Sequence, residues 1–327
     1  MTRLYQQSPS VYDLPIPIRS SLPTSARKKP RFTFLSEQFH TAKALDSTQK
    51  NGLYIADFQL SKDRYVIFSD VHKGNGTSGL DDFRHNEALY CEALNHYLDN
   101  DYRLILNGDI EECWKSPLSD IMETYDSTAF EVERQFAARG PDFYMRTYGN
   151  HDDDWANPKK VDRYLSPILR RQIKVYPSIR LGSRIMIAHG HQGDLTSDRL
   201  ARVSRRVVRR IWKPLQHLLK LKMPGKVAGN NPIQSNRDRY LHQWAVKNRQ
   251  LLIAGHTHRA LLNPDPKTGS TDHYINLGCC VLLDGMTGIE IDQGEIRLVK
   301  WAMNASDEKV ERSVFASSEL GALMARL

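Results

Sequence analysis

The chain has 327 residues, of which 40% are hydrophobic and 26% charged, and its formal net charge is +8. This composition excludes a collagen-like, a mostly disordered and a polytopic membrane protein, and the length is enough for one large domain or two small ones. Because no run approaches the roughly 20 apolar residues that span a bilayer, and the N-terminus lacks a secretory apolar core, we expect a cytoplasmic protein.

Residues 1–60 are rich in Pro, Ser and Thr and contain the basic run Arg27-Lys28-Lys29 before Pro30, which predicts an irregular or disordered N-terminal arm. A helix is expected from Asp81 or Asp82 to Asn100. Five short apolar segments of β type each lead to Asp, Asn or His with Gly close by. They are residues 65–68 before Ser69-Asp70-Val71-His72, 103–106 before Asn107-Gly108-Asp109, 143–147 before Gly149-Asn150-His151-Asp152, 185–188 before His189-Gly190-His191, and 251–254 before Gly255-His256-Thr257-His258.

The spacing of these polar strand ends predicts the fold class. Asp70, Asp109, Asn150 and His189 lie 39, 41 and 39 residues apart, which is about the length of one strand, one helix and their loops. We therefore expect an α/β protein. Ligands gather at the carboxyl ends of strands in such sheets, so the five polar ends are expected to converge on one site.

The residue types at these ends indicate metal chemistry. Asp, Asn and His offer oxygen and imidazole donors, which suit Mn, Fe or Zn. The four cysteines have none of the spacings of a metal clip and are expected to be reduced thiols: Cys91, Cys113, Cys279 and Cys280. Two ions that share a bridging ligand can hold a phosphoester and a hydroxide nucleophile together, and the number of donors here is enough for such a site.

In order and in spacing, these five motifs resemble those of the calcineurin-like metallophosphoesterases, over residues 65–260. The resemblance implies a four-layer α/β/β/α sandwich with a helical insertion, in which residues 274–277 and 288–299 supply the second sheet. The form Gly108-Asp109-Ile110-Glu111-Glu112-Cys113-Trp114 is similar to that of the UDP-2,3-diacylglucosamine pyrophosphatases. This second resemblance is partial, since those enzymes commonly carry Arg where this chain has His151.

The resemblance also implies a role for each site residue. Two divalent ions are expected, with Mn as the expected metal and Fe or Zn as alternatives. The first ion would be held by Asp70, His72 and His258, both ions would be bridged by Asp109, and the second would be completed by Asn150, His189 and His256. His189 is preferred to His191 because it follows its strand directly. The catalytic residue would be His151, which assists at the leaving oxygen, and Asp152 would orient it. Glu112 is expected to be a supporting carboxylate and not a ligand.

An insertion at about residues 195–248 contains the excess positive charge. Residues 199–226 include ten Lys or Arg and no acidic residue, whereas the rest of the chain has 36 basic and 38 acidic residues. Apolar residues at spacings of three and four predict a basic amphipathic helix over 199–213, and Tyr240, Leu241 and Trp244 indicate a second helix. The basic segment would hold a phosphorylated small-molecule or nucleotide-linked substrate, an anionic membrane surface or a nucleic acid, or would be only a solvated helix face.

Together these observations predict a phosphoesterase domain over residues 61–305, followed at 306–327 by a C-terminal tail or helix. The expected reaction is hydrolysis of a phosphoester or pyrophosphate bond by a hydroxide bound to the metal pair. Two alternatives remain open, a nucleic-acid phosphodiesterase that uses the basic helix and a metal-binding interaction module without catalysis. The sequence leaves the oligomeric state open.

Overall fold

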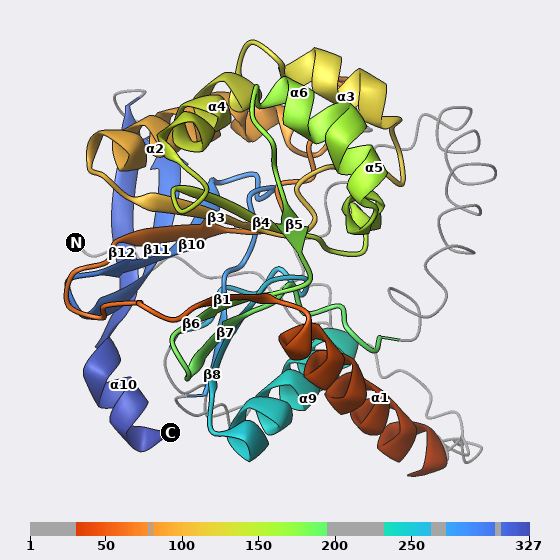
Figure 1. Cartoon of the computed structure of the whole chain (residues 1–327), viewed down its shortest axis with the longest axis vertical. Helices are drawn as coiled ribbons and strands as arrows, with labels where there is room; N and C mark the ends of the chain where they lie inside the picture. The colour runs from red at the N-terminus through yellow and green to blue at the C-terminus, as the bar shows by residue number, and fades with distance from the viewer. Residues whose placement is uncertain (1–30, 78, 80, 195–231, 263–272, 305–308) are drawn as a thin grey trace, which may run out of the picture.

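The computed structural model describes residues 31–77, 79, 81–194, 232–262, 273–304 and 309–327. Two mixed sheets face each other, and helices cover the outer side of each (Figure 1). The seven-stranded sheet has the spatial order β12 (Val310–Glu319), β11 (Glu295–Met303), β10 (Met286–Asp292), β2 (Tyr65–Phe68), β3 (Arg103–Asn107), β4 (Tyr144–Thr147) and β5 (Val175–Tyr176). The five-stranded sheet has the order β1 (Leu53–Ile55), β6 (Ile179–Leu181), β7 (Ile185–Ile187), β8 (Leu251–Ala254) and β9 (Tyr274–Asn276).

The helices fall into two groups on opposite sides of the sheet pair (Figure 1). Those on the side of the larger sheet are α2 (Glu87–Asp99), α3 (Leu118–Tyr125), α4 (Ala129–Arg139), α5 (Pro158–Lys160) and α6 (Ser166–Ile168), with the short segments η1 (Arg84–Asn86), η2 (Asp153–Ala156) and η3 (Val161–Leu165). Those on the side of the smaller sheet are α1 (Arg31–Lys50) and α9 (Pro232–Asn248), and the C-terminal α10 (Leu320–Arg326) follows β12.

Alternation along the central strands builds the three parts of the core. Ile67 of β2 and Ile253 of β8 belong to the apolar cluster between the two sheets. The next residue of β2, Phe68, points to the opposite face and packs against Tyr90 of α2. On the far side of the smaller sheet, Trp244 of α9 packs in a third cluster. The central strands are buried on both faces, which explains why their sequences are continuous apolar runs.

The structure confirms an α/β fold with two sheets and finds all five predicted strands, with β2, β3 and β4 parallel. Part of the predicted sheet order is wrong. Residues 274–276 do form a strand of the second sheet, but β10 and β11 extend the first sheet, because β10 pairs antiparallel with β2. The second sheet is instead built mainly from β1, β6, β7 and β8.

The predictions for the two ends of the chain also need correction. Within the segment interpreted as an irregular arm, the structure has α1 and β1, and β1 pairs with β6. Residues 1–30 lie outside the described residues. At the C-terminus, residues 306–327 do not form only a tail or helix, because β12 pairs along its length with β11 before α10 begins. The folded unit thus extends beyond the predicted limits of residues 61–305 on both sides.

Within the predicted insertion, the second helix is present as α9. The predicted basic helix over residues 199–213 lies outside the described residues. In the part of the chain that the structure describes, no helix combines the length and apolar character needed to cross a membrane.

A cluster of four charged side chains is buried behind the strand ends, and we call it the charged cluster: Lys73, Glu111, Glu133 and Arg146. Lys73 Nζ lies 2.5 Å from Glu133 Oε1 and 3.4 Å from Glu111 Oε1. Arg146 Nη2 lies 2.5 Å from the other oxygen of Glu111. All four side chains are fully buried, so two positive charges neutralise two negative ones within the protein interior.

Candidate metal centre

The polar residues at the five strand ends come together at one place. Asp70 and His72 follow β2, Asp109 follows β3, Asn150 and His151 follow β4, His189 follows β7, and His256 and His258 follow β8. Three overlapping groups have their ligand-type atoms within 4.8 Å of one another: Asp70 with His72 and His258, His72 with Asp109 and His151, and Asp109 with His189 and His256. Asp109 is shared by two of these groups, which is the placement that a bridging ligand requires.

Each of the two aspartates turns one oxygen toward the histidines. Asp70 Oδ2 accepts hydrogen bonds from the Ser69 hydroxyl and the backbone N–H of His256, at 2.6 and 2.9 Å. Its Oδ1 lies 3.0 Å from His258 Nε2. Asp109 Oδ1 accepts the backbone N–H of His151 at 2.7 Å, while Oδ2 lies 3.1 Å from His189 Nε2. Internal hydrogen bonds therefore fix each carboxylate and leave its second oxygen directed at the centre.

Neighbouring groups also orient two of the imidazole rings. His189 Nδ1 lies 2.9 Å from the backbone carbonyl of Asn107, so the Nδ1–H donates there and Nε2 faces Asp109. His72 Nδ1 lies 3.3 Å from Glu112 Oε2, and its Nε2 lies 4.0 Å from Asp109 Oδ2. In both rings the nitrogen that faces the carboxylates is the one that would bind a metal.

Unsatisfied atoms at the centre test whether these residues fit a metal. The buried side-chain atoms without a hydrogen-bond partner among the described residues include three that belong to candidate ligands: His72 Nε2, His189 Nε2 and Asn150 Oδ1. Buried polar atoms without partners are costly, and most find one. All three are lone-pair donors of the kind that Mn, Fe and Zn accept, so the residues present fit divalent cations.

The protonation equilibria show how strongly the centre favours positive charge. Burial would lower the pKa of His189, but the carboxylates of Asp109 and Asp70 outweigh it and raise this pKa to about 9. Burial would raise the pKa of Asp70, yet His189 and His258 hold it below its usual range. The same balance, with His189 and His151 as the cationic partners, keeps the pKa of Asp109 low. The aspartates thus remain ionised and need nearby cations, which protons on histidine or metal ions supply.

The backbone at the candidate ligands is unusual. Positive φ angles near 55° occur at Asp70, His72, Asp109 and His258, and φ is 67° at His256. These are five of the nine such residues other than glycine in the described part of the chain. Left-handed backbone costs energy for residues with a Cβ and concentrates at functional sites. This observation supports the same set of residues independently of their chemistry.

His151 lies at the edge of the centre and is positioned by two side chains. Its Nδ1 lies 2.9 Å from Glu112 Oε1. The Trp114 ring stacks on the imidazole with a centroid separation of 4.3 Å, and its Nε1 donates to the backbone carbonyl of Asn150 at 2.7 Å. Glu112 was predicted to be a supporting carboxylate, and Trp114 was given no role at the site. Their positions three and five residues after Asp109 were the available signal that they face this site.

The prediction that Asp152 orients His151 is wrong, because the carboxylate of Asp152 has other partners. Its carboxylate accepts the backbone N–H groups of Gly149, Ile110 and Asp109, at 2.6, 2.8 and 3.1 Å. The partner of the His151 ring is instead Glu112. Asp152 therefore ties the loop after β4 to the loop after β3, and it acts on the site through the backbone.

The structure also separates the two histidines of the His189-Gly190-His191 motif. Of the two, only His189 belongs to one of the three groups of ligand-type atoms. The pKa of His191 lies well below its usual value, because the side chain is buried and the charges of His189 and His256 act in the same direction. Asp194 was given no role from the sequence, and its Oδ2 lies 3.9 Å from His256 Nε2. Its position at the end of the segment His189-Gly190-His191-Gln192-Gly193-Asp194 was the sequence signal for it.

Gly149 is required by the close approach of two loops. A Cβ at this position would lie 2.1 Å from Asp109 Oδ1 and 2.7 Å from Asp109 N. We expect Gly149→Ala to displace the carboxylate and weaken metal binding by about ten- to a hundredfold, as the loss of a supporting partner does. Isothermal titration with Mn²⁺ would measure this. Gly321→Ala in α10 is the control, because its Cβ meets nothing closer than 3.6 Å. Equal Mn²⁺ affinity in both variants would contradict the expectation.

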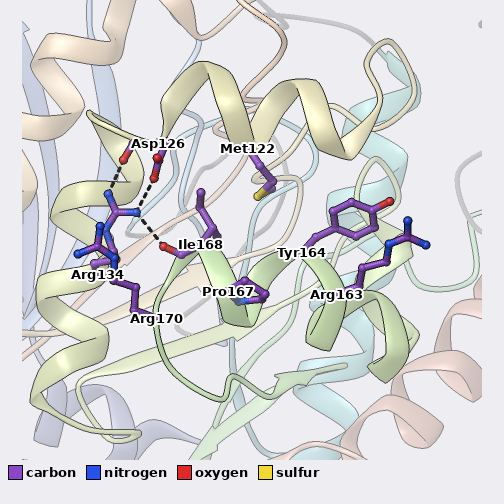
Figure 2. Close-up of a pocket in the computed structure, with 8 residues that line it drawn as sticks. All are labelled: Met122, Asp126, Arg134, Arg163, Tyr164, Pro167, Ile168 and Arg170. Carbon is purple, nitrogen blue, oxygen red and sulfur yellow. Dashed lines mark hydrogen bonds and ion pairs between the residues drawn. The ribbon is translucent and has the colours of Figure 1, made fainter.

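A separate pocket of about 360 Å³ lies among α3, α4 and α6 (Figure 2). Its Arg134 is held by Asp126 Oδ1 at 2.6 Å and by the backbone carbonyl of Ile168 at 2.8 Å. None of the residues that line it belongs to the metal centre, and its acidic group is occupied by Arg134. It is therefore not a second copy of the metal site. The lining residues are Met122, Asp126, Arg134, Arg163, Tyr164, Pro167, Ile168 and Arg170.

A family model and several solved structures match this chain. The model of the calcineurin-like phosphoesterases matches residues 64–260. Among solved structures, vacuolar protein sorting 29 from Cryptosporidium parvum is 13% identical, with 80% of this chain and 100% of that chain covered and a TM-score of 0.38. Vps29 from Entamoeba histolytica in complex with Zn²⁺ is 16% identical, with 77% and 99% covered and a TM-score of 0.32. A search of curated proteins found no match. The structural similarities are too low to transfer a function.

Proposed function

This chain belongs to the calcineurin-like phosphoesterase family, and on that premise we propose that it is a metal-dependent hydrolase of phosphoester or pyrophosphate bonds. The observation that carries the proposal is the convergence of three ligand groups on Asp109 and His72, together with buried lone-pair donors that have no hydrogen-bond partner among the described residues. A scaffold without a metal would leave these atoms unsatisfied at considerable cost.

Two groups of residues would each hold one divalent ion. Asp70, His72 and His258 would hold the first, and Asn150, His189 and His256 the second, with Asp109 between them. When bound, a pair of Mn²⁺, Fe or Zn²⁺ ions supplies the Lewis acidity that activates water and offsets the charge of the phosphoryl oxygens.

His151 would supply the proton for the leaving oxygen. Burial disfavours its charged form, but the carboxylates of Glu112 and Asp109 outweigh burial and raise the His151 pKa. Its Nδ1–H donates to Glu112, which leaves Nε2–H free to donate to a leaving group. Trp114 would keep the ring in this orientation by stacking on it.

The test is hydrolysis by protein that has been stripped with a chelator and then given Mn²⁺, Zn²⁺, Fe²⁺, Mg²⁺ or no metal. The substrates are bis(p-nitrophenyl) phosphate, p-nitrophenyl phosphate and a UDP-sugar pyrophosphate. Turnover that returns with metal supports the proposal, and the preferred substrate identifies the bond that is cleaved. Two bound ions without turnover on any of the three would favour a metal-binding interaction module instead.

The proposed partner is a phosphorylated small molecule or a nucleotide-linked substrate. The ten basic side chains of residues 199–226 also suit a nucleic acid or an anionic membrane. The salt dependence of activity distinguishes a small-molecule substrate from a nucleic acid, because each phosphate contact to a nucleic acid releases counterions. A steep fall in nuclease activity with salt, without a matching fall for the small esters, would favour the nucleic-acid phosphodiesterase.

Glu112→Gln keeps the size of the side chain that faces His151 and removes its charge. Because the imidazole loses its ionic partner, we expect kcat to fall about ten- to a hundredfold, a part of the roughly 100- to 10,000-fold that a positioned acid contributes. Steady-state kinetics on bis(p-nitrophenyl) phosphate would measure this, with metal content determined in parallel. Glu92→Gln on the exposed face of α2 serves as the control. Unchanged kcat in Glu112→Gln would refute the role given to Glu112.

A further inference from the structure

Two consecutive residues of α9 reach into the loops that hold one side of the metal centre. Arg237 is 6% exposed. Its Nε donates to the backbone carbonyl of Gly190 at 2.8 Å, and its Nη2 donates to the carbonyl of Gln192. Gly190 directly follows the candidate ligand His189. The guanidinium therefore fixes the backbone on the C-terminal side of that ligand, since its donors have a rigid planar arrangement.

The neighbouring Asp238 holds the second loop of the same side. It is 3% exposed, and its Oδ1 accepts the hydroxyl of Thr257 at 2.9 Å. Thr257 lies between the candidate ligands His256 and His258. Asp238 Oδ2 lies 3.0 Å from Arg259 Nη1, just after them. Successive α9 side chains thus hold the His189 loop and the His256 loop.

Helix α1 completes this arrangement from outside the family match. Arg237 Nη1 donates to the hydroxyl of Thr41 at 2.7 Å, and Thr41 is 1% exposed. A Cβ on Gly193 would lie 2.6 Å from Thr41 Cα, so α1 presses directly on the loop that follows His189. The match to the family begins at residue 64, whereas α1 ends at Lys50. A segment outside the matched region is therefore in contact with the metal loops.

We propose that Arg237 is a positioning residue for the metal site formed by Asp109, His189 and His256, and that α1 belongs to this positioning device through Thr41. The inference rests on the proposed function, because it assigns a role toward an ion pair. The hydrogen bonds of Arg237 to Gly190 and Gln192 hold the loop after His189, so its effect is expected at the site that contains His189. The site formed by Asp70, His72 and His258 is not held by Arg237 and is expected to keep its affinity.

The experiment is a titration of the full chain with Mn²⁺ alone. Calorimetry measures the affinity for each ion, and electron paramagnetic resonance shows whether the two ions are spin-coupled. Wild type is expected to bind two ions that show spin coupling. Arg237→Gln is expected to bind the second ion about ten- to a hundredfold more weakly, so that at two equivalents the signal of an isolated Mn²⁺ remains. Arg237→Lys keeps the positive charge but loses the planar set of N–H donors, and it is expected to recover only part of the affinity for the second ion.

Lys247→Gln is the matched control, because it removes one positive charge from the exposed last turn of the same helix. Thr41→Val provides a second test if Arg237→Gln does not fold, and it is expected to weaken the second ion about threefold or more. Two coupled ions with wild-type affinity in Arg237→Gln, or in Thr41→Val if that variant alone folds, would overturn the inference. Failure of the wild type itself to bind two ions would overturn the proposed function and, with it, the premise of the inference.

Discussion

Asp109→Asn is expected to lose at least one of two metal ions and to reduce kcat/KM for bis(p-nitrophenyl) phosphate by about a thousandfold, because metal ions supply several kcal/mol of transition-state stabilisation. The substitution keeps the shape of the side chain. Its oxygen can still accept the backbone N–H of His151, which lies 2.7 Å from Asp109 Oδ1. What it removes is the negative charge and the second oxygen, which lies 3.1 Å from His189 Nε2.

Elemental analysis of the purified variant would give its metal content, and steady-state kinetics its activity. Asp99→Asn at the exposed end of α2 is the control, since it removes the same charge away from the site. The variant is expected to remain folded, because asparagine keeps the shape of the side chain and the substitution removes the electrostatic repulsion between Asp109 and Asp70. Two bound ions and full activity in Asp109→Asn would show that this residue does not bridge the pair.

Glu133→Gln is expected to lower the free energy of unfolding by about 3–5 kcal/mol, the usual cost of removing one partner from a buried ion pair. Glu133 accepts the Lys73 ammonium at 2.5 Å and the hydroxyls of Tyr144 and Tyr90 at 2.6 and 3.1 Å. Glutamine cannot balance the Lys73 charge. In the charged cluster, Glu111 would then face both Lys73 and Arg146 alone.

Urea unfolding would measure the loss. Glu131→Gln is the matched control on the same helix, because its side chain is 49% exposed and its partner Arg134 keeps the carboxylate of Asp126, so a loss of only about 0–1 kcal/mol is expected. Replacing both partners, as Lys73→Met with Glu133→Leu, is expected to recover most of the stability, since no unpaired charge remains. Equal stability of Glu133→Gln and Glu131→Gln would contradict this account.

The sequence predicted the strands that carry the site because their signal is local. An apolar run such as residues 65–68 followed by Asp70 and His72 is sufficient to place a strand and a polar end. The strand β12 was not predicted, because it lies at the edge of the sheet, is only partly buried and contains no apolar run. The sequence also did not predict which sheet contains β10, since strand pairing depends on contacts between segments that are distant along the chain.

The same distinction applies to the site. The candidate ligands were identifiable because their residue types and order carry the chemistry. The partners of Asp152 are backbone N–H groups, which no residue type reveals. Arg237 and Thr41 were missed because their contacts join two helices to a loop, far apart along the chain.

The left-handed backbone at five of the candidate ligands implies a trade between function and stability. Such a conformation costs about 1–3 kcal/mol at a residue with a side chain, somewhat less for aspartate, and glycine would adopt it freely. We therefore expect His72→Gly or His256→Gly to raise the melting temperature of the metal-free protein while removing a metal ligand. Thermal stability alone would therefore favour glycine at these positions, and the side chains present there are explained by what the site binds.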